Sequence, residues 1–229
     1  ELWSIFDFLM PGLLGTRDSF AKRFESPVEH AEGDSAARLQ ALVSPFVLRR
    51  VKEEVVADLP EKIEDTVMAQ LTGEQRKLYL ANQDRIAQQV QHREAGEFKK
   101  DKLKVLAELT KLRQICCDPH LHYADYKAGS AKLDTCMELV HGALDGGHRI
   151  LLFSQFTGML DIIGKRLVKE DIAFLKLTGA SSKESRAKMV AQFQAGEVPV
   201  FLISLKAGGV GLNLTAADVV IHYDPWWNV

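Results

Sequence analysis

The chain has 229 residues, of which 46% are hydrophobic and 26% charged, and its formal net charge is −2. This composition is ordinary for a globular protein of one or two domains. No apolar run reaches the roughly 18 residues of a membrane span. The three cysteines do not make a disulfide framework, which indicates a reducing, intracellular compartment. Because the net charge gives no general attraction to nucleic acid, DNA binding would need a local basic surface.

The first part of the chain, residues 1–71, is expected to be mainly helical. We expect its helices at residues 2–9, 18–24, 35–43 and around 52–56. The polar stretch 26–34 contains proline and glycine and predicts a loop. Ile63, Val67, Ala69 and Leu71, together with Asp65, lie on one side of a stretch with period two, which predicts a strand. The chain does not begin with Met, so we expect it to be a piece of a longer protein.

Residues 72–128 are predicted to form a helical hairpin followed by a linker. Thr72 is a candidate N-cap, with Gln75 as its capping-box partner, for a helix that runs to about Gln91. A second helix is expected over 98–117. Its apolar face would carry Leu103, Leu106, Leu109, Leu112 and Cys116. The lysines of this helix alternate with acidic residues, which favours a solvated face over a DNA contact.

Residues 129–229 show an alternation of helices and apolar strands. We expect helices at 132–144, 157–169 and 182–194, and strands at 149–153, 173–177, 198–204 and 218–223. Apolar strands separated by helices of this length indicate right-handed βαβ units and a parallel sheet. The predicted fold class is therefore α/β, a parallel sheet with flanking helices, preceded by a mostly α-helical protrusion region. The predicted domains are 1–71, 72–128 and 129–229.

Polar residues that follow two of these strands are candidate phosphate ligands, because parallel sheets bind their ligands at the carboxyl ends of the strands. Ser154 and Gln155 follow one strand, although a residue such as Ser154 more often caps the next helix. Thr178 and Gly179 follow another, with Arg186 one turn into the next helix. Taken alone, a turn, a cap and a solvated arginine explain these residues better than a phosphate site does, because these are the usual turn residues.

The strand at 198–204 is followed by the most informative segment. Lys206 and Asn213 enclose a stretch with three glycines, at positions 208, 209 and 211. Glycine lets backbone N–H groups approach an anion without a Cβ in the way. A phosphate-binding loop is therefore favoured over a simple tight connection.

The remaining motifs indicate which kinds of binding site and catalytic site the sequence favours or excludes. Trp226 and Trp227 follow the last strand, and we expect one of them in the core and the other free to stack on a base or sugar. The segment 116–122 has cysteines and histidines without metal-ligand spacing, so no metal site is expected. The sequence contains no GxxxxGK[ST] loop, no acidic pair placed for Mg²⁺ and no catalytic Ser–His–Asp set. We predict that this chain alone has no catalytic residues and does not hydrolyse ATP.

Taken in order, a series of segments resembles the Swi/Snf-type DNA translocases of helicase superfamily two. The segments are 1–15, 46–50 with 59–62, 112–119, 130–132, 150–156, 177–193, 205–214 and 217–228. The resemblance departs at Ala131, where the family often has Gly, and at Leu205, where it often has Ser or Thr. It implies the end of a first lobe, the helical protrusions and most of a C-terminal RecA-like lobe. The P-loop would precede Glu1 and the arginine fingers would follow Val229.

The resemblance implies ATP-driven translocation along double-stranded DNA and remodelling of protein–DNA complexes. The implied DNA-binding residues are Ser154, Gln155, Thr178, Gly179, Arg186, Lys206, Ala207, Gly208, Asn213 and Trp227. Gly209 and Gly211 would couple DNA to the nucleotide cleft. ATP and Mg²⁺ are the implied cofactors of the intact parent, with none bound by this piece alone. The implied partners are DNA phosphates, the missing first lobe and a DNA-bound protein, and no membrane is implied. The parent is expected to be associated with DNA inside the cell.

Two other functions stay open at this point. The hairpin over 72–117 could make the chain a non-catalytic module that binds a protein partner. The α/β part could also be a generic mononucleotide-binding domain. Charge reversal at Lys206 and Arg186 would separate DNA binding from the first alternative.

Overall fold

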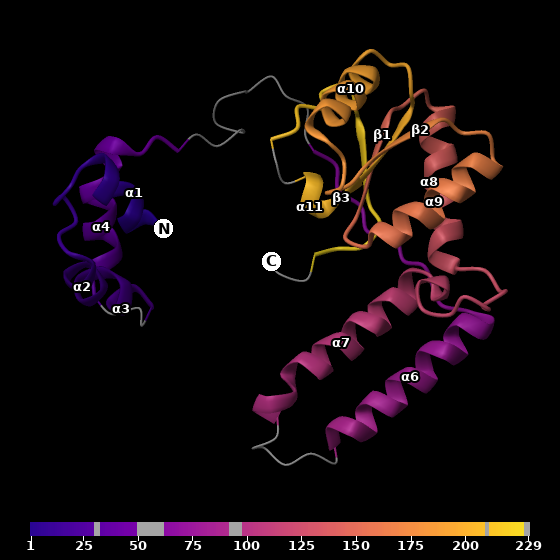
Figure 1. Cartoon of the computed structure of the whole chain (residues 1–229), viewed down its shortest axis with the longest axis horizontal. Helices are drawn as coiled ribbons and strands as arrows, with labels where there is room; N and C mark the ends of the chain where they lie inside the picture. Colours follow the sequence, from indigo (N-terminus) through magenta and orange to yellow (C-terminus); the bar gives the residue numbers. More distant parts are fainter. Residues whose placement is uncertain (30–32, 50–61, 92–97, 209–210, 227–229) are drawn as a thin grey trace. The chain divides into compact units, whose positions relative to one another are not determined.

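The computed structural model describes residues 1–29, 33–49, 62–91, 98–208 and 211–226 (Figure 1). The chain divides into two compact units, Glu1–Asp65 and Thr66–Val229. None of the helices in these ranges is both long enough and apolar enough to cross a bilayer. The helix expected around 52–56 lies outside the described residues. The division into three domains stays a prediction.

The first unit is a small group of helices. They are α1 (Leu2–Leu9), α2 (Arg17–Phe20), the π-helical turn η1 (Ala21–Glu25), α3 (Ser26–Glu29), α4 (Ser35–Val43) and the 3₁₀ turn η2 (Ser44–Phe46). Phe6, Leu14, Phe20 and Phe24 form its core. The loop predicted from residue 26 is wrong for 26–29, which are helical. The π turn ends at Glu25, two residues before Pro27, and such wide turns occur where the regular helical ladder is interrupted.

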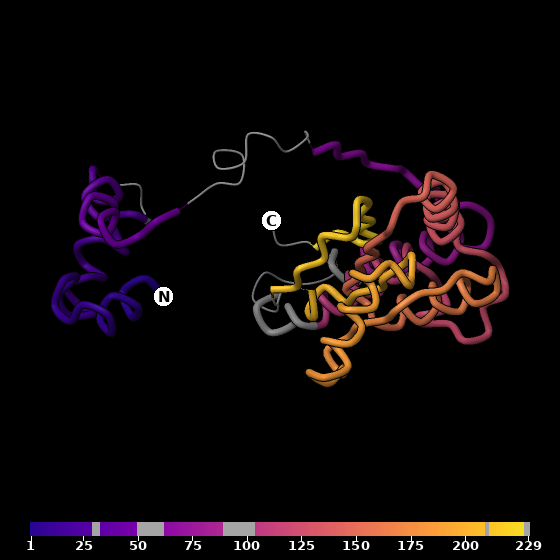
Figure 2. Tube along the Cα trace, turned by 90° about the horizontal axis from the view of Figure 1, so that it is seen from above, coloured from indigo at the N-terminus to yellow at the C-terminus, as the bar shows by residue number. Residues whose placement is uncertain are grey.

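The segment 62–72 has no regular secondary structure and runs as an extended trace (Figure 2). Its apolar residues Ile63, Val67 and Met68 are exposed. The strand predicted here is wrong. Alternating apolar residues form a strand only beside a partner strand that satisfies the backbone, and no strand among the described residues pairs with this segment.

The predicted hairpin is present as α6 (Gly73–Gln91) and α7 (Phe98–Cys117), two antiparallel helices that lie side by side (Figure 1). The apolar face predicted for α7 is buried only in part, since Leu106 and Leu109 are 42% and 40% exposed whereas Leu112 and Cys116 are half-buried. The side chain of Leu103 lies outside the described residues. A spacing of three residues falls short of a full turn by about 60° at each step. A row of leucines at that spacing therefore winds around the helix instead of following one face.

The second unit continues through the 3₁₀ turn η3 (Pro119–Leu121) and α8 (Ala131–Asp145) into a four-stranded sheet. The strands are β1 (Ile150–Ser154), β2 (Phe174–Leu177), β3 (Val200–Ser204) and β4 (Val219–His222), in the order β2-β3-β1-β4. All three neighbouring pairs are parallel, with Ser154 opposite Ser204. The predicted α/β class with a parallel sheet is confirmed.

Helices cover both faces of this sheet (Figure 1). On one face, α8 and α9 (Thr157–Lys169) pack on Ile150, Leu152 and Leu202. On the other face, α10 (Lys183–Gln194) packs on Phe201 and Ile203 through Phe193. Successive strand residues point to opposite faces, so β1 and β3 need apolar residues at nearly every position. A short helix, α11 (Leu205–Gly208), follows β3 directly.

Candidate nucleic-acid interface

The carboxyl ends of the four strands form one continuous edge of the sheet, because the strands are parallel and adjacent. The strand order places Thr178, Lys206, Gln155 and Asp224 along this edge in that sequence. Residues predicted as candidates from three separate segments are thus brought together. We call this row of strand ends and the loops that follow them the carboxyl edge.

The ends of β1 and β4 are joined by a buried carboxylate. Asp224 accepts hydrogen bonds from the Ser154 hydroxyl and, at 3.0 Å, from the backbone N–H of Gln155. Ser154 also accepts from the N–H of Phe156 at 3.1 Å and is fully buried. The candidate Ser154 therefore uses its hydroxyl inside the protein, where it shapes the turn that presents Gln155. Sequence reasoning missed Asp224; its signal was an acidic residue directly after an apolar strand.

Arg113 of α7 reaches the same two strand ends. Its guanidinium donates to Oε1 of Gln155 at 3.2 Å and to the carbonyl of Pro225 at 2.6 Å. It also lies 5.9 Å from the centre of the Phe156 ring. Nε2 of Gln155 is buried and has no hydrogen-bond partner within the described ranges. Arg113 was not among the sequence candidates, because nothing in a helical pattern indicates a contact 42 or 112 residues away along the chain.

The loop after β2 is a tight turn. The N–H of Thr178 donates to the Ser181 hydroxyl at 3.2 Å, and the N–H of Ser181 donates back to the Thr178 carbonyl at 3.1 Å. Gly179 lies at the exposed tip. Arg186 is half-buried and donates to the carbonyl of Ala207 at 3.3 Å, which ties α10 to α11. Thr178 and Gly179 are thus placed at the surface, whereas Arg186 also holds the neighbouring segment.

The segment after β3 begins as a helical turn instead of an open glycine loop. Lys206 is exposed and Ala207 is buried. Gly208 lies so close to Phe153 that an added Cβ would be 2.8 Å from a ring carbon. Close packing against the sheet is therefore one reason for this glycine, beside any approach of its N–H to an anion. Gly209 lies outside the described residues.

The rest of this segment is held by Gln194 of α10. The Gln194 amide donates to the carbonyl of Asn213 at 3.2 Å and to the Thr215 hydroxyl at 3.1 Å, and it accepts from the N–H of Ala216 at 2.8 Å. Gly211 has a φ of +48°, a value that favours glycine. The side chain of Asn213 stays exposed. Gln194 was missed because two of these three partners are backbone groups, which carry no sequence signal, and the third, the Thr215 hydroxyl, lies 21 residues away along the chain.

The two tryptophans lie in the segment that follows β4. Trp226 is 48% exposed, and Trp227 lies outside the described residues. Ser204, at the end of β3, is buried, and its hydroxyl has no partner among the described groups. The edge therefore combines exposed polar groups with two buried polar atoms, Gln155 Nε2 and Ser204 Oγ, that lack a described hydrogen bond.

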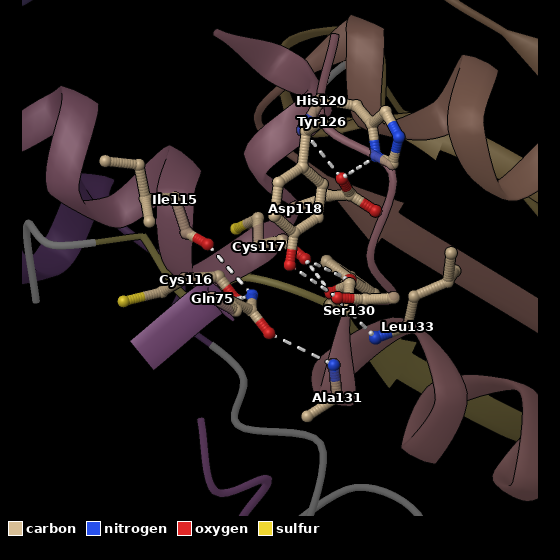
Figure 3. Close-up of polar contacts among 12 residues, drawn as sticks. Gln75, Ile115, Cys116, Cys117, Asp118, His120, Tyr126, Ser130, Ala131 and Leu133 are labelled. Carbon is tan, nitrogen blue, oxygen red and sulfur yellow. Dashed lines mark hydrogen bonds and ion pairs between the residues drawn. The ribbon is translucent and has the colours of Figure 1, made fainter. Parts of the chain in front are cut away.

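The base of the hairpin is joined to the sheet by a buried polar network, which we call the junction (Figure 3). Gln75 is 1% exposed, donates to the carbonyl of Ile115 at 2.9 Å and accepts from the N–H of Ala131 at 3.2 Å. Its predicted capping-box role is wrong, because its amide binds α7 and α8 instead of the start of its own helix. The carbonyl of Cys117 accepts from the hydroxyls of Ser130 and Tyr223, both at 2.8 Å.

The Cys-Cys-Asp-Pro-His segment completes the junction (Figure 3). Asp118 accepts hydrogen bonds from the backbone N–H of His120 at 2.8 Å and from its ring at 2.6 Å. Burial raises the pKa of Cys117 to about 12, so its thiol stays protonated and is a poor metal ligand. Across the part of the chain that the structure describes, no group of His, Cys, Asp and Glu could hold a metal ion.

Family models match nearly the whole chain. The SNF2-related domain matches residues 1–121, and the helicase conserved C-terminal domain matches residues 131–229. Among curated proteins, the putative ATP-dependent helicase/translocase YwqA of Bacillus subtilis is 39% identical over 239 residues, covering 100% of this chain and 25% of that protein. The DNA repair and recombination protein RAD26 of Saccharomyces cerevisiae is 33% identical over 256 residues, with 100% and 23% covered. The chain thus spans about a quarter of the length of these relatives.

Solved structures give the same match. The Sulfolobus solfataricus SWI2/SNF2 ATPase core in complex with dsDNA is 36% identical with a TM-score of 0.67, covering 99% of this chain and 49% of that one. The C-terminal domain of the same ATPase is 36% identical with a TM-score of 0.66, covering 73% of this chain and 74% of that one. The parallel sheet with its flanking helices is therefore similar to a helicase lobe.

Proposed function

This chain belongs to the SNF2-related family of helicases, and from that premise we propose that it supplies the DNA-binding second lobe of an ATP-dependent double-stranded DNA translocase. In this proposal the parent protein remodels protein–DNA complexes. Residues 1–71 are the tail of its first lobe, residues 72–128 the helical protrusion and linker, and residues 129–229 most of the RecA-like C-terminal lobe. The parent is DNA-associated inside the cell.

The observation that carries the proposal is the carboxyl edge, where the three adjacent strand ends of β2, β3 and β1 present candidate phosphate ligands side by side. Lys206, Gly179 and Asn213 are exposed there. The similarity to an ATPase core solved with dsDNA supports DNA phosphates as the ligand of this edge.

Each residue then has a stated role. Lys206 supplies a positive charge, while Gly179 and Gly208 leave room for backbone N–H groups near a phosphate. Thr178, Asn213 and Trp227 add polar and stacking contacts, and Gly209 and Gly211 transmit motion to the nucleotide cleft. Arg186 and Ala207 keep the two loops together through their hydrogen bond. Because these contacts would reach phosphates and not base edges, binding is expected to tolerate any sequence.

The nucleotide belongs to the parent and not to this chain. The sequence has no GxxxxGK[ST] loop, and the described residues contain no cluster of three or more His, Cys, Asp or Glu side chains that could hold a metal ion. The residues present therefore do not fit ATP and Mg²⁺, and we assign no step of hydrolysis to them. We expect no ATP turnover by the chain alone and turnover stimulated by double-stranded DNA in the full-length parent. Turnover by the chain alone would contradict this assignment.

Charge reversal at the carboxyl edge tests the DNA-binding role. The variant Lys206→Glu should weaken binding of a labelled DNA duplex about tenfold or more at low salt, because it removes one phosphate contact and adds repulsion. The matched control is Lys169→Glu. Lys169 is exposed, and it ends the helix that leads back from the carboxyl edge to the start of β2. Equal affinity of Lys206→Glu and wild type would overturn the proposal.

A second candidate function is protein binding by the hairpin. It is favoured by Leu80, Leu106 and Leu109, which are exposed on α6 and α7. Charge reversal at Lys206 and Arg186 separates the two functions. If duplex affinity is unchanged while a protein partner still binds, the hairpin is the functional surface and the DNA-binding role is wrong.

A further inference from the structure

Arg113 connects the hairpin to the carboxyl edge. It lies one turn before the end of α7, and its guanidinium contacts the turn after β1 and the loop after β4. The two loops are also joined beneath it by Asp224, which binds Ser154 and the N–H of Gln155. A side chain from the hairpin therefore holds the surface that the proposed function assigns to DNA.

The end of α7 is itself fixed to the body of the lobe. Gln75 joins α6 to the carbonyl of Ile115 and to the start of α8. The carbonyl of Cys117 receives hydrogen bonds from Ser130 and from Tyr223, the residue that follows β4. Since the backbone around Arg113 is held in this way, the position of its guanidinium relative to the carboxyl edge is set by the hairpin.

The side chain of Gln155 depends on Arg113 for its orientation. Its Oε1 accepts from Arg113, and its Nε2 has no partner in the described part of the chain. The last torsion of a glutamine is broad and roughly two-fold, so an amide without a fixed oxygen can turn over. A guanidinium donates only, and it therefore keeps Oε1 toward α7 and the NH₂ group on the other side.

We propose that Arg113 is a positioning residue that couples the hairpin to DNA binding at the carboxyl edge. It sets the orientation of the Gln155 amide and the place of the Pro225 loop, so that a displacement of the hairpin changes how the edge meets DNA phosphates. This inference rests on the proposed function and adds the hairpin as an element that controls it.

The test uses the full-length parent and compares three variants. Arg113→Met should raise the DNA concentration needed for half-maximal ATPase stimulation about tenfold, because it removes charged hydrogen bonds. Arg113→Lys keeps the charge and should recover part of the loss. The control is Arg85→Met, which removes an arginine of the same hairpin that pairs with Glu108 away from the edge. It should match wild type.

A double variant separates positioning from a purely structural role. If Arg113 acts in part through Gln155, then the loss in the double variant Arg113→Met with Gln155→Met should be smaller than the product of the two single losses, whereas independent effects would multiply. Unchanged DNA dependence in Arg113→Met, or multiplied effects in the double variant, overturns the inference. Failure of wild-type parent to respond to DNA at all would instead overturn the proposed function. If Arg113→Met does not fold, Arg113→Lys replaces it in both comparisons, since it is expected to keep part of the loss.

Discussion

The junction and the carboxyl edge are both built from polar side chains, but they use them in different ways. At the junction, Gln75 and Ser130 are buried, and each has hydrogen-bond partners on other elements. At the carboxyl edge, Lys206 and Asn213 are exposed, and Gln155 Nε2 is buried without a described partner. The polar groups of the junction are occupied by the fold, while the exposed side chains of the edge, Lys206 and Asn213, stay available to a ligand.

This difference predicts opposite effects of mutation. A buried group that loses its partner costs about 1–3 kcal/mol, since water does not replace the hydrogen bond. An exposed side chain away from such features changes stability by about 0.5 kcal/mol or less. Substitutions at the junction should therefore change the free energy of unfolding, and substitutions at the edge should change DNA binding. Three measurements test this division, and a fourth concerns an exposed pair outside both regions.

The largest effect is expected for Gln75→Leu. The leucine leaves the carbonyl of Ile115 and the N–H of Ala131 without their partner, which should lower the free energy of unfolding of the larger unit by about 3 kcal/mol. Urea unfolding measures this loss. Gln83→Leu, at an exposed position of the same helix, is the control and should change little. A loss equal to that of the control would show that the buried hydrogen bonds of Gln75 do not stabilise the fold.

A smaller loss is expected for Ser130→Ala. This serine caps α8 by accepting from the N–H of Leu133 and also donates to the buried carbonyl of Cys117. Its removal should cost about 1–2 kcal/mol. Ser182 caps α10 at an exposed site through one bond to the N–H of Ser185, so Ser182→Ala should cost less. Equal losses in thermal unfolding would show that burial of the second bond contributes nothing.

At the carboxyl edge, Lys206→Gln should leave stability unchanged and weaken DNA binding. Removing one phosphate contact should reduce the slope of log affinity against log salt by about one. Duplex titrations at several salt concentrations give this slope. Lys169→Gln should keep the wild-type slope. If Lys206→Gln lowers stability and leaves DNA binding normal, then Lys206 serves the fold and not DNA binding.

The smallest effect concerns the surface pair of His148 and Asp218. The hydrogen bond from His148, together with the N–H of Arg149, lowers the pKa of Asp218. A carboxyl whose pKa is lowered by folding stabilises the fold above its unfolded value of about 3.9, and this stabilisation is lost as the pH falls through the lowered pKa.

The measurement is unfolding of Asp218→Asn against pH. The variant should be slightly less stable than wild type near neutral pH, by about 0.5 kcal/mol or less because the pair is exposed. The difference should begin to shrink as the pH falls below about 4 and should disappear once the pH is below the lowered pKa of Asp218. A difference that grows in acid would mean that the lowered pKa does not contribute to stability.

The sequence was sufficient for the strands of the sheet and their parallel direction, although not for the order β2-β3-β1-β4. Apolar runs and helix lengths predicted all four strands of the α/β part and their parallel direction. Parallel strands in turn placed Gln155, Thr178 and Lys206 at one edge. These features follow from local periodicity and from general rules of chain connection, so no knowledge of individual contacts was needed.

The remaining features depend on contacts between distant residues. Gln75 binds the chain at Ile115 and Ala131, and Arg113 binds it at Pro225, 112 residues away. Such partners are carbonyl and N–H groups present at every position, and a residue pattern does not reveal them. The strand expected over 63–71 was wrong for a related reason, because alternation describes a strand's faces but not whether a neighbouring strand exists.

The spacing of the strands also fixes the length of the carboxyl edge. Three spacings of about 4.8 Å between neighbouring strands give a row of about 14 Å from β2 to β4. Each strand of duplex DNA carries one phosphate per about 3.4 Å of helix axis. A duplex laid along this row would therefore have a footprint of about four base pairs on the lobe, a length fixed by the backbone spacing of the sheet and independent of the side chains that line it.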